Sequence, residues 1–268
     1  MTERNQAMAV PSRRSGDPEE EPRSSRVLRA ALLSVLLLLP GAAEARDVVF
    51  GLRPVDPMVS RAGDGVAGLE AEIVSAALAV RGHRLVPYLG PLPRLDAALR
   101  ERRIDGLAPA VGHFGSKAWL TRPYLEYRNV AVTLSDRDLD LGSPADLKAL
   151  RVTAFPGAVE VLGADYRDAV AASPAYREEF KQELQVLSLK HGRADVIVVD
   201  RTILHHHVGR LSARLKSPLS VREHELFQPV RYRAAFADPV LAEDFNEGLV
   251  EISRNGQLDR IRDRYREP

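Results

Sequence analysis

Three residues that could bind a ligand each follow an apolar run with the composition of a β-strand. They are Lys117, Gly157 and Asp200. In open α/β sheets, ligands bind outside the carboxyl ends of the strands. A cation, a helix N-terminus at Gly157 with its free amides, and a carboxylate could together hold a zwitterion. We therefore predict a site for a small polar or anionic molecule, while a solvated Lys117 and an Asp200 that caps a helix remain open alternatives.

The sequence offers few groups for catalysis or metal binding. It contains no cysteine, which excludes disulfides, thiolate metal sites and a cysteine nucleophile. Neither the G-x-S-x-G nor the H-E-x-x-H spacing occurs. The residues 205–207 are three consecutive histidines, and consecutive helical residues point in different directions, so they cannot all face one ion. We predict no enzyme activity, no metal and no cofactor, and we assign 205–207 to a solvated turn or helix surface.

Short apolar runs alternate with helical patterns after residue 46, which is typical of an α/β fold. Strands are predicted at 48–52, 84–88, 104–108, 130–134, 151–155, 184–187 and 196–199. The run 196–199 is apolar throughout, as expected of a strand buried on both faces. Helices are predicted at 69–80, at 92–99, from 158 onward, at 241–252 and at 258–265.

The same pattern begins again after the polar stretch 135–140. We predict the two-lobed fold of periplasmic binding proteins, with the second lobe inserted in the first and each lobe packed separately. Lobe 1 is expected at 46–134 plus 223–268, and lobe 2 at 135–222. The two crossings between the lobes are then expected near Ser135 and near Arg222.

Residues 1–45 have the features of a leader with a secretory signal peptide. Arg23, Arg26 and Arg29 precede the mostly apolar run 30–39, and 43–45 supplies small residues at the two cleavage-site positions. The apolar run is about ten residues, whereas a membrane-spanning helix needs about 20. We predict cleavage before Arg46 and a periplasmic protein, which is not a lipoprotein because it has no cysteine to carry the lipid.

The composition is that of an ordinary soluble protein, with 45% hydrophobic and 28% charged residues. The formal net charge is only +1, and lysine and arginine are spread along the chain. A nucleic acid or an acidic membrane surface is therefore not an expected partner.

Six segments occur in the order and at the distances found in one family of exported proteins. They are 65–70, 99–106, 120–124, 146–148, 189–200 and 244–258. Over 47–266 the chain resembles the family 3 extracellular solute-binding proteins, which serve ABC importers of polar amino acids and related compounds. The resemblance implies two lobes that close on a small-molecule ligand about two linkers. It also implies a membrane permease as partner, and we expect a monomer.

The resemblance also implies roles for single residues. The family position whose arginine holds the ligand carboxylate looks like Lys117, and the acidic residue that receives the ligand's amino group is kept as Asp200. Because an ammonium cannot form the bidentate fork of a guanidinium, we expect looser selectivity for carboxylate geometry. Family positions with hydroxyl groups correspond to residues without side-chain donors, so we expect a less polar cleft; they are Pro109, Ala110, Gly112, Ala158 and Val159. The predicted ligand-binding set is completed by Pro57, Met58 and Leu92.

We predict the substrate-binding component of an ABC importer for a small polar or anionic, amino-acid-like metabolite. Two alternatives stay open. The segment 121–124 also resembles accessory binding proteins of periplasmic quinoprotein dehydrogenases, and the lost donors would suit a cleft that no longer carries a nutrient. Periplasmic cyclohexadienyl dehydratases look similar in fold, but here the arginine position is Lys117 and His113 is the one nearby candidate acid or base.

Overall fold

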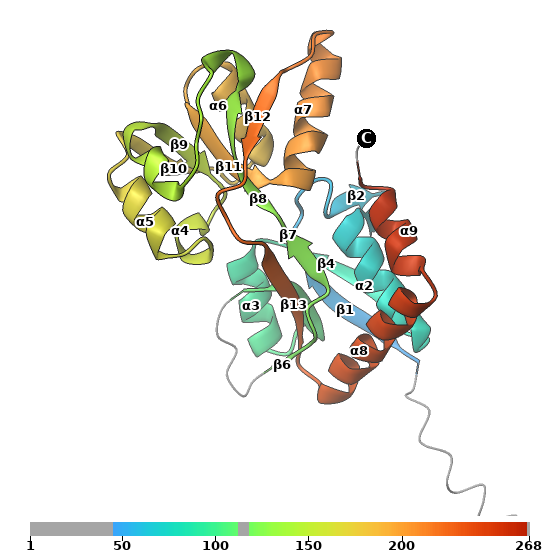
Figure 1. Ribbon diagram of the computed structural model, residues 1–268. Coiled ribbons are helices and arrows are strands. Elements are labelled where there is room, and N and C mark those ends of the chain that lie inside the picture. The colour runs from blue at the N-terminus through green and yellow to red at the C-terminus, as the bar shows by residue number, and fades with distance from the viewer. Residues whose placement is uncertain (1–44, 112–117, 267–268) are drawn as a thin grey trace, which may run out of the picture. The chain divides into compact units, whose positions relative to one another are not determined.

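The described residues form two mixed β-sheets and a small hairpin, with helices packed on both sheets (Figure 1). The computed structural model describes residues 45–111 and 118–266. The first sheet has the strand order β4-β1-β5-β13-β6, with β7 paired to β13. The second sheet has the order β10-β9-β11-β8-β12. We call the part that carries the first sheet lobe 1 and the part that carries the second sheet lobe 2.

Lobe 1 is built from two separate stretches of the chain. Its helices and strands are β1 (Asp47–Leu52), β2 (Ser60–Ala62), β3 (Gly65–Ala67), α2 (Leu69–Val80), β4 (Arg84–Leu89), α3 (Leu92–Arg100), β5 (Gly106–Ala110), β6 (Trp119–Leu120), β7 (Leu125–Tyr127), β13 (Val230–Phe236), α8 (Pro239–Arg254) and α9 (Gln257–Asp263). The strands β4, β1 and β5 run parallel, and β13 lies antiparallel to β5. The carboxyl ends of the three parallel strands therefore meet at one edge of the sheet.

Lobe 2 lies between β7 and β13 in the chain. Its elements are β8 (Asn129–Leu134), the 3-10 helices η2 (Ser135–Arg137) and η3 (Pro144–Ala149), β9 (Arg151–Ala154), α4 (Ala158–Val161), α5 (Ala164–Ala171), β10 (Ala175–Glu178), α6 (Gln182–Lys190), β11 (Val196–Asp200), α7 (Arg201–Leu215) and β12 (Val221–His224). The strands β10, β9 and β11 run parallel, while β8 and β12 are antiparallel to their neighbours. The predicted fold class, an α/β fold with the second lobe inserted in the first, is confirmed.

One predicted strand is wrong. Residues 184–187 belong to helix α6. The buried side chains of this helix include Gln182, Gln185, Val186 and Leu189, which recur at helical spacing. Two of the four are glutamines, so the apolar residues alone did not show the period, and the run 184–187 was too short to separate a strand from a helix.

Both crossings between the lobes differ from the predicted positions. The strand β8, expected in lobe 1, pairs with β11 and β12 in the second sheet, so the first crossing is at Arg128 rather than near Ser135. The strand β12 also pairs in the second sheet, so the chain returns between His224 and Val230 rather than near Arg222. The apolar pattern of a strand shows that the strand is buried but not which strand it pairs with. The positions of the two crossings could therefore not be read from the sequence.

The apolar core is also less divided than expected. Two clusters of buried residues belong to one lobe each, but the largest cluster joins buried residues of both. It runs from Phe50 on β1 and Phe245 on α8 in lobe 1 to Val130 on β8 and Ile203 on α7 in lobe 2. The prediction of two separately packed lobes is therefore wrong in this respect, because β8 continues directly from β7 and carries its buried side chains across.

A partly buried ion pair holds the turn before β11 to the start of β9. The Asp195 carboxylate accepts hydrogen bonds from the backbone amide of Arg151 at 3.0 Å and from its guanidinium at 2.9 and 2.8 Å. The Arg151 side chain, partly offset by burial, lowers the pKa of Asp195 to about 2. The charge of Asp195 therefore contributes stability at neutral pH, and this contribution is lost as the pH falls from about 4 towards 2.

The Asp195→Ala variant should lower the free energy of unfolding by about 2 kcal/mol at pH 7, because a charge-assisted hydrogen-bond set is lost at a partly buried site. Urea unfolding followed by circular dichroism measures this difference. The matched control is Asp168→Ala, which removes an exposed carboxylate from α5 and should stay within about 0.5 kcal/mol of the parent. Equal effects of the two substitutions would contradict the role given to the ion pair.

The predicted leader with its signal peptide, residues 1–45, lies outside the described residues except for Ala45. Among the helices that the structure describes, none is both long enough and apolar enough to cross a membrane.

Candidate functional site

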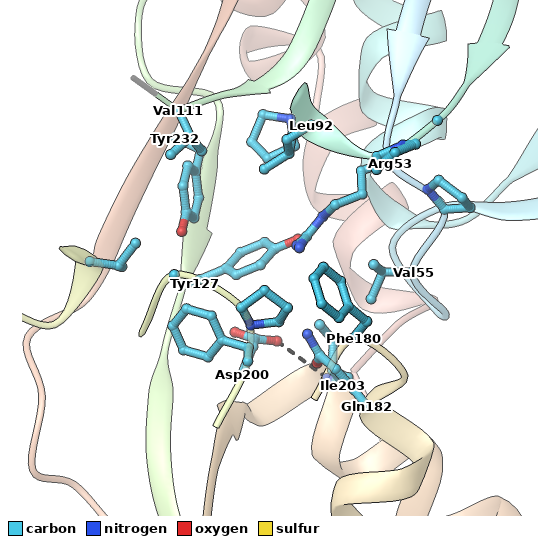
Figure 2. A pocket seen from close by; sticks show the side chains of 18 of the residues that line it. Arg53, Val55, Leu92, Val111, Tyr127, Phe180, Gln182, Asp200, Ile203 and Tyr232 are labelled. Atoms are coloured by element: carbon cyan, nitrogen blue, oxygen red, sulfur yellow. Dashed lines mark hydrogen bonds between the residues drawn. The ribbon is translucent and has the colours of Figure 1, made fainter. Parts of the chain in front are cut away.

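A pocket of about 760 Å³ lies where the carboxyl ends of the parallel strands of both sheets meet (Figure 2). Its volume is within the range of about 300–1,000 Å³ typical of small-molecule sites. Lobe 1 lines it at the ends of β1, β4 and β5 and at the start of α3, and lobe 2 lines it after β9, β10 and β11. The sequence analysis expected a ligand site outside the carboxyl ends of the strands, and in both lobes these ends line this one pocket.

Four of the predicted ligand-binding residues lie together in the pocket wall. They are Leu92 and Pro109 from lobe 1 and Gly157 and Asp200 from lobe 2. Two others, Gly112 and Lys117, fall outside the described residues, so the position expected to hold a carboxylate is not placed.

The remaining five predicted residues are not in the pocket wall. Pro57, Met58 and Ala158 are buried, the latter two in the apolar core. Ala110 and Val159 are half-buried and pack against apolar clusters. The fold uses all five for packing, because small and apolar side chains next to a strand end are also needed to fill the core beneath it.

The Asp200 carboxylate is tied to the backbone of lobe 2. One oxygen accepts the amides of Thr202 at 2.9 Å and Ile203 at 3.2 Å, which caps helix α7. The other oxygen accepts the amide of Arg128 at 2.9 Å, so the same side chain also holds the first crossing between the lobes. Asp200 is only 3% exposed, and this burial, opposed by the three amides, raises its pKa to about 6. The helix-cap alternative is what the structure shows, and the carboxylate lies at the pocket in addition.

Gly157 also has a local structural role. It adopts a φ of 80°, a left-handed conformation that glycine accepts readily, at the start of α4. Its amide donates to the Glu178 carboxylate at 2.7 Å. The Gly157 amide, which was expected to bind the ligand, therefore already donates its hydrogen bond to a carboxylate of the protein.

One arginine of the pocket wall, Arg53, was not predicted from the sequence. Arg53 directly follows β1, and Figure 2 shows its side chain reaching into the space beside Tyr127. Within 45–111 and 118–266, no hydrogen bond or ion pair holds its guanidinium. The rule that selected Asp200 at the end of β11 applies equally to Arg53 at the end of β1, so the signal was present in the sequence.

Aromatic rings form much of the remaining wall, and none was predicted there. Tyr127 on β7 and Tyr232 on β13 lie beside the crossings with ring centroids 4.9 Å apart, edge to face. Phe155 follows β9 and is buried, whereas Phe180 follows β10 and is 78% exposed. Figure 2 shows Phe180 at the pocket next to Gln182.

Two buried amide side chains in the wall have unused hydrogen-bonding capacity. Among the described residues, the Asn129 Nδ2 and the Gln182 Oε1 have no hydrogen-bond partner. Asn129 is 3% exposed and Gln182 is 6% exposed, so bulk water does not compensate either atom. A buried donor or acceptor without a partner costs about 1–3 kcal/mol, which a ligand with matching polar groups would recover.

A buried acid lies behind the pocket. Glu70, in the first turn of α2, is 1% exposed and accepts a hydrogen bond from the Tyr124 hydroxyl. Burial raises the pKa of Glu70 to about 7, although the Tyr124 hydroxyl and the positive charge of Arg53 both oppose this increase. The acid is therefore about half protonated at neutral pH in the folded protein.

The three consecutive histidines lie on α7 and differ from one another. His205 lies 2.5 Å from the Glu223 carboxylate, while His207 is buried and its pKa is lowered to about 4, mainly by desolvation. The prediction of a solvated surface is therefore wrong for His207. In the part of the chain that the structure describes, no three histidine or acidic residues come together as a metal site.

No protein-family model matches the chain, and no curated protein is similar to it in sequence. Solved structures are similar to it in fold. An ancestral arginine-binding protein bound to arginine has a TM-score of 0.67 and 18% identity over 82% of this chain and 98% of that one. The GluR0 ligand-binding core in complex with L-glutamate has a TM-score of 0.67 and 16% identity over 84% of this chain and 99% of that one. A histidine kinase sensor domain with similarity to periplasmic binding proteins has a TM-score of 0.67 and 20% identity over 82% and 96%. The chain therefore has the two-lobed fold of periplasmic binding proteins.

Proposed function

We propose that the chain is the periplasmic substrate-binding component of an ABC importer and binds a small polar or anionic organic molecule. The observation that carries this proposal is the pocket of about 760 Å³, whose wall combines strand ends of both lobes with the guanidinium of Arg53. The named ligands of two proteins with the same fold, arginine and glutamate, support a ligand of this size. The permease that would receive the ligand is part of the proposal.

We also propose that the pocket binds its ligand without changing it. The buried acid at its wall, Asp200, already accepts three backbone amides and so serves the helix and the crossing. A general acid or base must reach the ligand proton directly or through one water molecule. The three amides favour a structural role for this carboxylate over proton transfer.

Export to the periplasm completes the proposal. The sequence 23–45 has a basic segment, an apolar run and small residues at the cleavage positions. Expression of the full chain with a C-terminal tag, followed by N-terminal sequencing of the periplasmic fraction, should give a chain that begins at Arg46. Retention of the uncleaved chain in the cytoplasm would contradict this part.

A thermal-shift screen tests the binding function itself. The set should contain amino acids, small carboxylates and polyamines, each checked by isothermal titration calorimetry when it shifts the melting temperature. A ligand at 100 times its Kd should stabilise the folded state by about 2.7 kcal/mol. For a domain of this size that corresponds to a rise in Tm of about 5–10 °C. A folded protein that responds to none of these compounds would contradict the importer function and favour the dehydrogenase-accessory role.

A further inference from the structure

We infer that the ligand is an organic monoanion with an aromatic body, such as an aromatic carboxylate, rather than a polar amino acid. This inference rests on the proposed binding function and specifies the substrate class of the same pocket. It follows from three properties of the wall: which charges are unpaired, where apolar surface is exposed, and which buried polar atoms lack a partner.

The first property is the charge that the pocket offers to a ligand. Arg53 has no hydrogen bond or ion pair within the described part of the chain, and it faces the interior of the pocket (Figure 2). Arg94, also in the wall, instead donates to the Tyr88 hydroxyl at 3.1 Å and lies over the Tyr88 ring. A guanidinium whose N–H groups have no acceptor among the described residues can bind a carboxylate through two parallel hydrogen bonds. Arg53 therefore favours an anionic group on the ligand.

The charges of the wall also bear on the amino group that an amino acid would bring. Asp200, the residue expected to receive it, is 3% exposed and accepts amides with both of its oxygens. Glu160, the other acid in the wall, is exposed to solvent, where an ion pair contributes little. Among the described residues of the wall, no carboxylate is therefore as well placed to bind an ammonium group as Arg53 is to bind an anion.

The second property is the apolar surface of the wall. Phe180 is 78% exposed and lines the pocket, so its ring presents apolar surface that a ligand can contact. The same wall contains the rings of Phe155, Tyr127 and Tyr232 and a series of prolines, namely Pro54, Pro91, Pro93, Pro109 and Pro156. Aromatic rings pack against one another in stacked or edge-to-face pairs, each worth about 0.5–1.5 kcal/mol beyond the area that they bury. An aromatic ligand would cover Phe180 and make such contacts.

The third property, the two buried amide atoms without a partner, favours a ligand that carries a polar substituent. The Asn129 Nδ2 is a donor and the Gln182 Oε1 is an acceptor, and both are buried in the wall. A hydroxyl group both donates and accepts, so it can partner either atom. Among aromatic carboxylates, those with a ring hydroxyl should therefore bind more tightly than those without one.

Calorimetric titration of the purified protein with six probes tests the inference. The probes are 3-phenylpropanoate, 3-(4-hydroxyphenyl)propanoate, L-phenylalanine, L-tyrosine, L-arginine and L-glutamate. Each carboxylate should bind at least about tenfold more tightly than the amino acid that differs from it by one amino group. The hydroxylated carboxylate should bind more tightly than the plain one by about threefold to tenfold, as one neutral hydrogen bond predicts.

Two variants, each with a matched control, test whether Arg53 and Phe180 contact the ligand. Arg53→Gln should weaken carboxylate binding by about 10- to 100-fold, as expected for a charge-assisted contact. The matched control Arg94→Gln removes the same charge from the same wall, but its guanidinium is already bonded to Tyr88, so it should change binding by less than about threefold. Phe180→Ala should weaken binding by about tenfold, whereas Leu184→Ala, which removes another exposed apolar side chain outside the wall, should leave it unchanged.

The outcomes separate this inference from the function on which it rests. Tight binding of L-arginine or L-glutamate without binding of the aromatic carboxylates would overturn the inference and leave the proposed function intact. Carboxylate binding that is unaffected by Arg53→Gln in a variant with a parent-like circular dichroism spectrum would also overturn it. If none of the six probes binds and the broader thermal-shift screen is also negative, both proposals fail.

Discussion

Replacing Gly248 with alanine should lower the free energy of unfolding by about 3 kcal/mol, although alanine is the better helix former. Gly248 lies in α8 where this helix crosses α2, and a Cβ at this position would overlap the carbonyl oxygen of Ala77 and lie 2.7 Å from its carbonyl carbon. The obstacle is helix backbone, which cannot rotate away as a side chain can. Overpacking of this kind costs about 1–3 kcal/mol, and the upper end applies here because whole helices must move apart. Thermal unfolding should show a fall in Tm of about 6–12 °C.

A second helical glycine supplies the control. Gly209 lies in α7 and is exposed, so Gly209→Ala should follow helix propensity alone and raise the free energy of unfolding by up to about 1 kcal/mol. The two substitutions are chemically identical, and the expected effects have opposite signs. A gain in stability from both would show that the helices separate easily at Ala77 and would contradict the tight crossing.

Much of the fold could be predicted because apolar periodicity reports burial directly. The run 196–199 is buried throughout and forms the central strand β11, as its uniform apolar composition indicated. The partner of a strand is a different matter. Strand β8 is equally apolar whether it joins the first sheet or the second, so the crossing at Arg128 depended on pairings between residues far apart in the chain. Helix α6 was missed for a related reason, since two of its buried positions are glutamines.

Those residues of the candidate site that directly follow or end a strand could be predicted from the sequence. Asp200 and Gly157 were selected because they follow strands, and both line the pocket. The same rule would also have selected Arg53 after the first strand, but the cation predicted from it was Lys117, after the run 104–108. Phe180 could not be selected in this way, because its importance depends on exposure at a pocket that only the three-dimensional arrangement reveals.

The Glu70→Gln variant should be more stable than the parent at pH 8, by about 3 kcal/mol. Burial raises the pKa of Glu70 from 4.5 to about 7, so the folded state holds this proton more tightly than the unfolded state does. The protonated acid stabilises the fold below about pH 4.5, and this stabilisation is lost as the pH rises through 7. A pKa change of one unit corresponds to about 1.4 kcal/mol, which gives the expected size. Glutamine keeps an oxygen that can accept the Tyr124 hydroxyl but never ionises.

The measurement is the free energy of unfolding in urea at pH values from 4 to 8 for the parent and the variant. The difference between the two should be small at pH 4 and grow to its full size by pH 8. Asp200, whose pKa is raised to about 6 by burial, contributes a slope of the same sign to both proteins and cancels in the difference. The control Glu160→Gln removes an exposed carboxylate from α4 and should leave the pH dependence unchanged.

A difference between Glu70→Gln and the parent that stays constant from pH 4 to 8 would mean that the Glu70 carboxyl group titrates alike in the folded and unfolded chain. In that case the positive charge of Arg53 would be stabilising an ionised Glu70 behind the pocket, which would leave Arg53 less free to bind an anionic ligand.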